Sequence, residues 1–285
     1  MATGDAFLTK HSPTWCPGCG NFSIWIALRT ALANLGFDPH SVVVSYGVGC
    51  SGNENNFVGT YAFHGLHGRP MPVGIGIKLA NHALPVIVSG GDGDGYGEGL
   101  SHFLNGMRGN IDITYLVHDN QIYGLTTGQN SPTTEKGVKS KTNPGGVLDQ
   151  ALPPLALSLH GGATFVARAF SGNAPQLIAI IEAAIKHKGF AHVDILQPCV
   201  TFNKLNTYSY FYQRVYDVAK EQHDPTNFQA ALTKAQEWGD HIPTGILYQI
   251  DRPTLEDQLP VLQNGPLVSR PVEGIDITKD MTSLI

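Results

Sequence analysis

Two glycine-rich polar segments have the residue types needed to bind a diphosphate together with a divalent cation. They are GGDGDGYGEG at residues 90–99 and HDNQIYGLTTGQ at residues 118–129. Glycines let backbone N–H groups approach a diphosphate, and the N-terminus of a following helix favours its negative charge. Asp92 and Asn120 supply the carboxylate and amide oxygens that Mg²⁺ prefers, and the backbone carbonyl of Ile122 can complete the ligand set. The two segments therefore predict a magnesium and diphosphate site.

The cysteines indicate a second site. Cys16 and Cys19 form a C-x-x-C loop ahead of an expected helix, where two thiolates can bind one metal ion or one edge of a cluster. Cys50 and Cys199 each follow an expected strand. Four thiolates at one edge of a sheet suit a [4Fe–4S] cluster or a structural zinc ion. The spacing alone leaves these two alternatives open.

Composition argues against several classes of partner. A net charge of −5 and a pI near 6.1 favour neither nucleic acid nor an anionic membrane surface. The sequence has no apolar run approaching the roughly 20 residues of a membrane span, and its start lacks the apolar core of a secretory signal. The cytoplasm is therefore the expected compartment. A Walker-type nucleotide loop is also excluded, because GxxxxGK[ST] does not occur.

The elements that must position these residues alternate along the chain. Short apolar runs alternate with helical segments, which is typical of an α/β fold with a doubly wound, mainly parallel sheet. The expected strands lie at 41–49, 84–94, 112–120, 162–169 and 190–199, and the expected helices at 22–36, 97–109 and 175–189. Ligands of such folds bind at the carboxyl ends of the strands. We therefore expect Cys50, Asp92, Asn120 and Cys199 at one edge.

Two regions are predicted. Residues 1–205 form the α/β domain that carries both sites. Residues 206–285 form a C-terminal extension, with an amphipathic helix near 226–237 and then a proline-rich part. Because that last part cannot bury a core of its own, we interpret the extension as an arm that covers the domain or contacts a partner subunit.

Several unusual motifs occur together in a known order. They are WCPGCG, GVGCSG, YAFHGLHGR, GGDGDGYGEG, DNQIYGLTTGQNSPTT and LQPC. Across residues 12–205 the chain thereby resembles the β subunits of 2-oxoacid:ferredoxin oxidoreductases. The resemblance implies a thiamine-diphosphate-binding (PP-type) fold and an enzyme that oxidatively decarboxylates a 2-oxoacid with coenzyme A. It also implies that the products are an acyl-CoA and CO₂, and that electrons pass through a [4Fe–4S] cluster to ferredoxin. The motifs look most like the 2-oxoglutarate branch.

The same resemblance assigns roles to individual residues. The GDG segment with its distant Asn resembles the thiamine-diphosphate motif, in which Asp92, Asn120 and the Ile122 carbonyl hold Mg²⁺. His67 is expected near the diphosphate or the reacting centre, as a catalytic residue. The cluster ligands implied are Cys16, Cys19, Cys50 and Cys199. The residues expected to line thiamine diphosphate are Val48, Gly49, Cys50, Ser51, His67, Gly93, Asp94, Gly124 and Leu125.

The chain shows only the diphosphate half of a thiamine-diphosphate enzyme. A partner α subunit is therefore expected to supply the Glu that contacts the aminopyrimidine ring, in an αβ or (αβ)₂ assembly. One alternative is a non-redox thiamine-diphosphate 2-oxoacid decarboxylase subunit with a structural zinc site. The other is a non-catalytic assembly subunit that binds a metal.

Overall fold

The computed structural model describes residues 4–271, 273 and 277–282, and its centre is an eight-stranded sheet. The strands are β1 (Val43–Tyr46), β2 (Tyr61–His64), β3 (Val86–Gly91), β4 (Thr114–Asp119), β7 (Phe165–Phe170), β8 (Ala191–Leu196), β9 (Val215–Asp217) and β10 (Ile242–Gln249). They are arranged in the order β2-β1-β3-β4-β8-β7-β10-β9. Neighbours from β2 to β7 run parallel, whereas β10 is antiparallel to β7 and parallel to β9. The expected mainly parallel sheet is confirmed.

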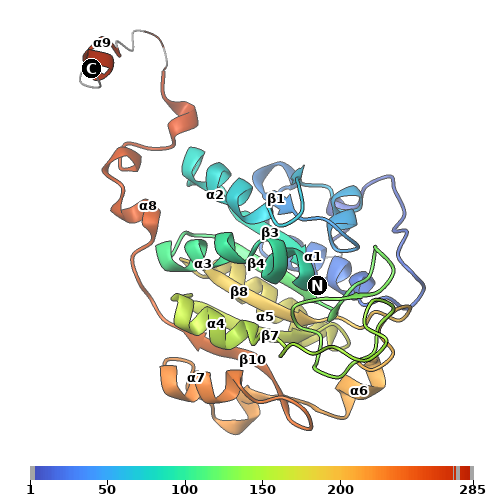
Figure 1. The fold of residues 1–285 in the computed structure, drawn as a ribbon. Helices are drawn as coiled ribbons and strands as arrows, with labels where there is room; N and C mark the ends of the chain where they lie inside the picture. Colours follow the sequence, from blue (N-terminus) through green and yellow to red (C-terminus); the bar gives the residue numbers. More distant parts are fainter. Residues whose placement is uncertain (1–3, 272, 274–276, 283–285) are drawn as a thin grey trace.

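Helices cover both faces of the sheet (Figure 1). One face packs against α1 (Asn21–Asn34) and α5 (Ala174–Lys186), and these two helices also contact each other. The opposite face packs against α2 (Pro70–Ala80), α3 (Leu100–Gly109), α4 (Pro154–Gly161) and α7 (Phe228–Ala235). The shorter helices are α6 (Tyr208–Tyr212), α8 (Leu255–Gln258) and α9 (Thr278–Thr282). This two-sided coverage keeps the middle of the sheet out of water.

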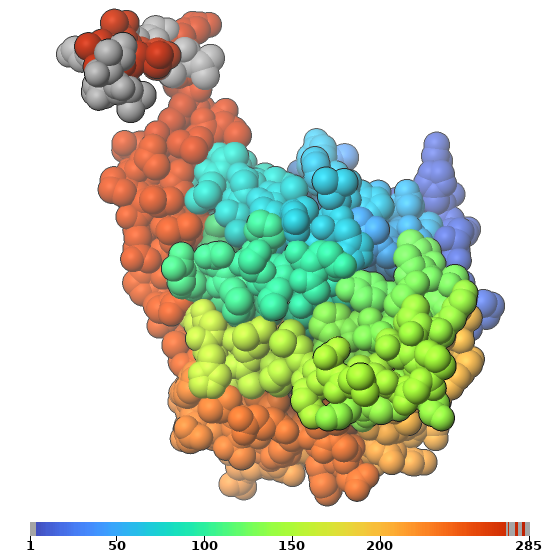
Figure 2. Space-filling view, in the orientation of Figure 1, coloured from blue at the N-terminus to red at the C-terminus, as the bar shows by residue number. Residues whose placement is uncertain are grey.

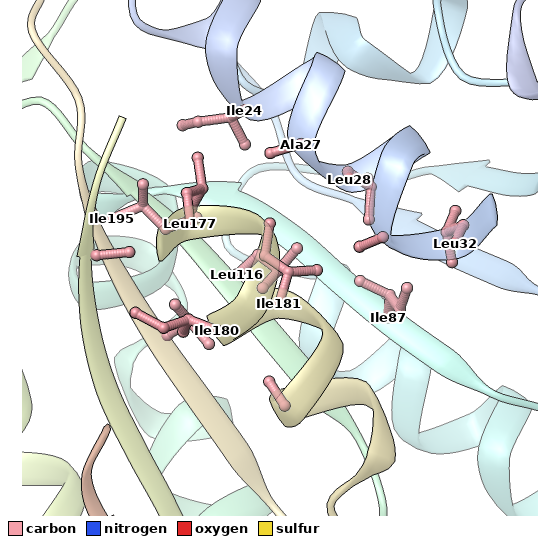
Figure 3. Close-up of a cluster of buried hydrophobic side chains, with 14 of the residues drawn as sticks. Ile24, Ala27, Leu28, Leu32, Ile87, Leu116, Leu177, Ile180, Ile181 and Ile195 are labelled. Carbon is pink, nitrogen blue, oxygen red and sulfur yellow. The ribbon is translucent and has the colours of Figure 1, made fainter. Parts of the chain in front are cut away.

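Aliphatic side chains between α1, α5 and the sheet form one of the main cores (Figure 3). Leu28 of α1 and Leu177 of α5 are fully buried, and so is Leu116 in the sheet below them. Burying each such side chain stabilises the fold by roughly 1.5–3 kcal/mol. The strands are therefore held as a rigid platform, and their ends can position polar groups.

The sequence located the central strands and several helices. It missed β2, α2, α4, β9 and β10. Strand β2 escapes a search for apolar alternation because the four residues of this edge strand are all exposed. Strand β10 contains Pro243 and also Gly245 at φ +120°, residues that disfavour a strand in a sequence reading. The helix expected at 97–109 is preceded by a π-helical segment, η4 (Gly93–Glu98), which begins directly after Asp92.

The C-terminal section contributes to the sheet before it becomes irregular. β9, α7 and β10 all pack onto the domain, and the helix expected near 226–237 corresponds to α7. Beyond β10 the chain runs along one side of the molecule past α8 to α9 (Figure 1), and Figure 2 shows it beside α2. The boundary predicted at residue 205 remains a prediction. Both predicted regions include residues outside the described part of the chain, which are 1–3, 272, 274–276 and 283–285.

Within the described residues, the helices are all too short or too polar to cross a membrane.

Candidate functional site

One cavity lies where the central strands end. Its walls come from the segments that follow β1, β3 and β4, together with the loop that leads into α2. All the residues predicted to contact the cofactor or magnesium line it, namely Val48, Gly49, Cys50, Ser51, His67, Asp92, Gly93, Asp94, Asn120, Ile122, Gly124 and Leu125. The structure thus brings this predicted set together, and the roles of its members remain predictions.

Asp92 is fixed at the floor of the cavity by two hydroxyl groups. Ser131 Oγ and Thr133 Oγ1 donate hydrogen bonds of 2.5 and 2.6 Å to Asp92 Oδ2. Burial raises the pKa of this carboxyl to about 6, although the two hydroxyl groups act in the opposite direction. The hydrogen bonds hold the carboxylate in one orientation, as a metal ligand requires.

Asn120 is held at the next strand end by groups on both sides of its amide. Its Oδ1 accepts a 3.0 Å hydrogen bond from the backbone N–H of Ile122, and its Nδ2 donates to Gln197 Oε1 at 3.1 Å. Between them, Gln121 adopts φ +59°, a left-handed conformation that non-glycine residues rarely take. Ile122 then begins the hairpin of β5 (Ile122–Tyr123) and β6 (Gln129–Asn130). This turn places the Asn120 amide and Ile122 at the same cavity.

Asp94 orders the cavity walls through its side chain. Its Oδ1 accepts hydrogen bonds from the backbone N–H groups of Val48 at 3.0 Å and Gly68 at 2.9 Å. Burial raises the pKa of Asp94, whereas these two hydrogen bonds lower it. The loops after β1 and before α2 are thereby tied to η4. A Cβ atom on Gly47 would lie 2.1 Å from Asp94 Oδ2, so a glycine is needed there.

His67 lies at the margin of the cavity beside a carboxylate. Its Nδ1 lies 2.9 Å from Glu98 Oε2, and the Tyr123 hydroxyl donates to the same oxygen at 3.2 Å. The imidazole side chain is 35% exposed, so solvent or a ligand in the cavity can reach it. Glu98 therefore holds both rings at the margin of the cavity.

The four cysteines are free thiols, and Cys50 lines the cavity. Cys16 is exposed, Cys19 is buried, and Cys50 and Cys199 are half-buried. A Cβ atom placed on Gly124 would lie 3.7 Å from Cys50 Sγ and 3.6 Å from Cys199 Sγ. Burial, with a smaller contribution from the neighbouring Cys199 and Cys16, raises the pKa of Cys50 to about 11. Burial likewise raises the pKa of Cys19 to about 12.

Hydrogen bonds join the loops that carry these thiols. Trp15 Nε1 donates to the backbone oxygen of Cys50 at 2.6 Å, which ties the C-x-x-C loop to the loop after β1. The backbone N–H of Gly20 donates to Pro198 O at 3.2 Å, which ties the C-x-x-C loop to the loop after β8. Over the described residues, no three His, Cys, Asp or Glu side chains form a group that could hold a metal ion. Neither the four predicted cluster ligands nor the predicted magnesium ligands, of which only Asp92 is of those types, therefore form such a group in this structure.

Several residues of this region were not assigned by the sequence prediction. Ser131 and Thr133 lie in NSPTT, which was noted only as part of a motif, although hydroxyl groups beside an acidic metal ligand are a usable signal. Glu98 and Tyr123 lie within the two glycine-rich segments. Gln197 precedes Pro198 and Cys199, and nothing in its spacing indicated that it contacts Asn120.

Comparison with known proteins agrees with this geometry. Residues 39–195 match the family model of the thiamine pyrophosphate enzymes for their C-terminal TPP binding domain, and residues 199–264 match the model for the C-terminal part of the pyruvate ferredoxin oxidoreductase beta chain. The 2-oxoacid:ferredoxin oxidoreductase subunit beta of Saccharolobus solfataricus is 46% identical over 247 residues, which cover 82% of this chain and 81% of that protein. The chain belongs to the β subunits of the 2-oxoacid:ferredoxin oxidoreductases.

Further relatives of this β subunit include proteins named for 2-oxoglutarate. The 2-oxoglutarate oxidoreductase subunit KorB of Mycobacterium tuberculosis is 41% identical over 200 residues, covering 70% of this chain and 54% of that one. A solved structure of the 2-oxoglutarate:ferredoxin oxidoreductase from Magnetococcus marinus, with 2-oxoglutarate, coenzyme A and succinyl-CoA bound, is 37% identical. Its TM-score is 0.91, and the match covers 99% of this chain and 96% of that chain.

The β subunit is thus part of a multi-subunit oxidoreductase, and its central domain is of the thiamine-diphosphate-binding type. The alternative of a non-redox decarboxylase subunit is not favoured, because the curated relatives are named as ferredoxin oxidoreductases.

Proposed function

We propose that this β subunit binds thiamine diphosphate through Mg²⁺ held by Asp92, Asn120 and the Ile122 carbonyl. The observation that carries the proposal is their position around one cavity with backbone-rich walls. The donor set fits the ion, because it offers one carboxylate, one amide oxygen and one carbonyl. Gly93 in the cavity wall must be a glycine, because a Cβ atom there would lie 2.3 Å from the Tyr123 ring.

The chemistry follows from what these residues hold in place. When bound, thiamine diphosphate supplies a carbon nucleophile and an electron sink for decarboxylation of a 2-oxoacid. Asp92 and Asn120 fix the orientation of the diphosphate end, while Asp94 keeps the two facing loops at a set distance. His67, paired with Glu98, is the proposed proton-holding group at the cavity margin. The remaining proposed cofactor contacts are Val48, Gly49, Cys50, Ser51, Gly124 and Leu125.

The proposed ligands of a [4Fe–4S] cluster are Cys16, Cys19, Cys50 and Cys199. Two features of the structure support this assignment. The neighbouring thiols add to the raised pKa of Cys19 and of Cys50, and positively charged iron would stabilise the thiolates that repel one another in its absence. Cys50 also lines the cofactor cavity, so a cluster on these thiols would lie beside thiamine diphosphate. Cys16 is exposed, and electrons would leave for ferredoxin from its side.

The proposed substrates are 2-oxoglutarate and coenzyme A, which the Magnetococcus marinus protein of the same fold binds. In the described part of the chain, the cavity is lined by neither lysine nor arginine. The distal carboxylate of 2-oxoglutarate therefore requires a cation from elsewhere, and we assign it to the α subunit. The same subunit would supply the Glu that contacts the aminopyrimidine ring, in an αβ or (αβ)₂ assembly working in the cytoplasm.

The exposed edge of the sheet supports such a partner. Tyr61 and Phe63 of β2 are 58% and 49% exposed, and Leu66 in the following loop is 77% exposed. These apolar groups immediately precede His67 in the chain. A subunit that covered them would also close the cavity from solvent.

Anaerobic co-purification of the β subunit with its α subunit tests the proposal. We expect about four iron and four sulfide per αβ pair if the α chain carries no cluster, stoichiometric thiamine diphosphate in the presence of Mg²⁺, and coenzyme-A-dependent reduction of ferredoxin with 2-oxoglutarate. A complex that bound zinc in place of iron, or that turned over pyruvate much faster than 2-oxoglutarate, would overturn the cluster or the substrate assignment respectively.

A further inference from the structure

A single buried side chain connects the two proposed cofactor sites. Gln197, 1% exposed, lies directly after β8. Its Oε1 accepts a 3.1 Å hydrogen bond from Asn120 Nδ2, and its Nε2 lies 3.4 Å from Cys19 Sγ, to which it donates. One amide therefore touches both a proposed magnesium ligand and a proposed cluster ligand.

Backbone groups determine the orientation of this amide. The second N–H of Gln197 Nε2 donates to Pro198 O at 2.8 Å. Rotating the amide by 180° would place Oε1 against that carbonyl and Nε2 against the Asn120 amide nitrogen, so both contacts would be repulsive. Asn120 is oriented in the same way, because its Oδ1 accepts from the backbone N–H of Ile122. Both amides therefore have a unique orientation, and the donor faces the sulfur.

The contact between Gln197 and Cys19 requires close packing of two loops. A Cβ atom on Gly20 would lie 2.8 Å from Gln197 Cγ, so only a glycine allows the C-x-x-C loop to approach this closely. The N–H of Gly20 also donates to Pro198 O. The glycine after Cys19 thus brings the thiol to the amide of Gln197.

A hydrogen bond to a ligating sulfur favours the reduced form of an iron–sulfur cluster, because reduction adds negative charge that the N–H group stabilises. The bond from Asn120 has a different consequence. Because the Nδ2 side of the Asn120 amide donates to Gln197, the Oδ1 side faces Ile122 and the cavity. The two ends of Gln197 therefore act on two different properties.

We propose that Gln197 is a positioning residue that raises the reduction potential of the cluster through Cys19 and orients Asn120 toward Mg²⁺. This inference rests on the proposed function, because it requires both cofactors. Gln197 would make the cluster potential and the affinity for thiamine diphosphate depend on one side chain.

Two substitutions separate the two ends of the side chain. Gln197→Glu keeps an oxygen for Asn120 Nδ2 but replaces the N–H group that faces Cys19 Sγ with an oxygen and adds a negative charge beside the cluster, and both changes lower the potential. The neutral variant Gln197→Leu shows the effect of losing the N–H group alone. At the wild-type midpoint potential, we expect the Gln197→Glu variant to hold about one tenth of the wild-type ratio of reduced to oxidised cluster, a shift of about 59 mV for one electron. Its Mg²⁺-dependent affinity for thiamine diphosphate should stay within about threefold of wild type. Gln197→Leu should show the same direction of shift and also lose roughly tenfold in that affinity, since Asn120 loses its partner.

The measurements are a redox titration of the cluster EPR signal and thiamine diphosphate binding, both on the αβ complex. The matched control is Thr114→Val. It removes a buried hydrogen bond from the Thr114 hydroxyl to Ala184 O, at the end of β4 opposite to Asn120. It should change neither property. A general loss of structure would alter both properties in both Gln197 variants, whereas the proposed role alters only the potential in Gln197→Glu.

A spectroscopic measurement on the unaltered protein covers the case in which the variants do not assemble. Wild-type complex made with glutamine carrying ¹⁵N only in its side-chain amide should show ¹⁵N coupling to the reduced cluster in pulsed EPR. Absence of that coupling, or a Gln197→Leu potential equal to wild type, would overturn the inference. A wild-type complex without a cluster would instead refute the proposed function.

Discussion

Ser131 Oγ lies 2.5 Å from Asp92 Oδ2, and this hydrogen bond joins the loop after β6 to the end of β3. Both residues are almost fully buried. Because Asp92 lines the cofactor cavity, this bond fixes the orientation of a carboxylate that faces the cavity. The first prediction follows from this contact.

Ser131→Ala should weaken Mg²⁺-dependent binding of thiamine diphosphate by roughly tenfold, since a hydrogen bond to a charged group contributes about 1.5–3 kcal/mol. Titration calorimetry on the αβ complex measures the change. Ser140→Ala, which removes an exposed hydroxyl that contacts only Thr142 and its own turn, is the control and should leave affinity unaltered. Equal affinities for Ser131→Ala and wild type would show that Asp92 needs no support from this hydroxyl.

Asp92→Ala should abolish the Mg²⁺ dependence of thiamine diphosphate binding while the iron and sulfide contents stay at wild-type values. The reason is spatial, because the Asp92 side chain bonds to Ser131 and Thr133 and, within the described residues, makes no hydrogen bond to the cysteine loops. The test is to measure Mg²⁺-dependent binding of thiamine diphosphate and the iron and sulfide contents on the same preparation. Normal turnover by this variant would exclude Asp92 as the metal ligand.

Cys50→Ser should produce the opposite pattern. We expect loss of iron, sulfide and the reducible EPR signal, because a hydroxyl is a much poorer cluster ligand than a thiolate. Thiamine diphosphate binding should weaken only modestly, since Cys50 lines the cavity but does not bind the proposed Mg²⁺. An unchanged iron content would exclude Cys50 from the cluster.

Much of this site could be predicted because consecutive parallel strands end at the same edge. Asp92 and Asn120 follow β3 and β4, which are neighbours both in sequence and in the sheet. The partner of Asn120 could not be found in this way. Gln197 follows β8, which pairs with β4 although β7 precedes it in the chain. The pairing of β4 with β8 is a tertiary interaction, and local sequence patterns do not predict it.

The missed elements have a similar explanation. Strand β2 has neither a buried face nor an apolar alternation, because all four residues of this edge strand are exposed. Its place in the sheet depends on pairing with β1, which is a tertiary interaction. The hydroxyls of Ser131 and Thr133 reach Asp92 only after the β5–β6 hairpin has turned the chain back over the cavity. Sequence spacing alone does not predict such a return.

Glu54 provides a prediction about pH. It is fully buried beneath the cysteine loops, with Oε2 3.4 Å from the Ser89 hydroxyl, and burial raises its pKa from 4.5 to about 8. Between these values the folded chain keeps a proton that the unfolded chain releases. The stabilisation is therefore complete below pH 4.5 and is lost as the pH rises to about 8, with a slope of up to roughly 1.4 kcal/mol per pH unit.

The measurement for Glu54 is the free energy of unfolding of the chain as a function of pH. We expect Glu54→Gln to make the decline between about pH 5 and pH 8 shallower, because a neutral amide does not titrate and only other buried carboxyls, such as Asp92, still contribute. Tyr46, His118 and Arg29 are other ionisable groups near Glu54, and all three are unchanged in this variant. Parallel pH profiles for Glu54→Gln and wild type would contradict the assignment.

Gly52 and Gly76 form a matched pair for the last prediction. A Cβ atom on Gly52 would lie 2.0 Å from the backbone oxygen of Gly47, so Gly52→Ala must push apart the two ends of the loop that carries Cys50. We expect it to destabilise the chain by about 1–3 kcal/mol and to lower iron incorporation. Gly76 is exposed within α2 and has no atom within 4 Å of the added methyl group, so Gly76→Ala should stabilise by roughly 0.5–1 kcal/mol. Chemical denaturation and iron analysis test both. If Gly52→Ala were as stable as Gly76→Ala, the close approach of Gly52 to the Gly47 backbone oxygen would not restrict the residue at position 52.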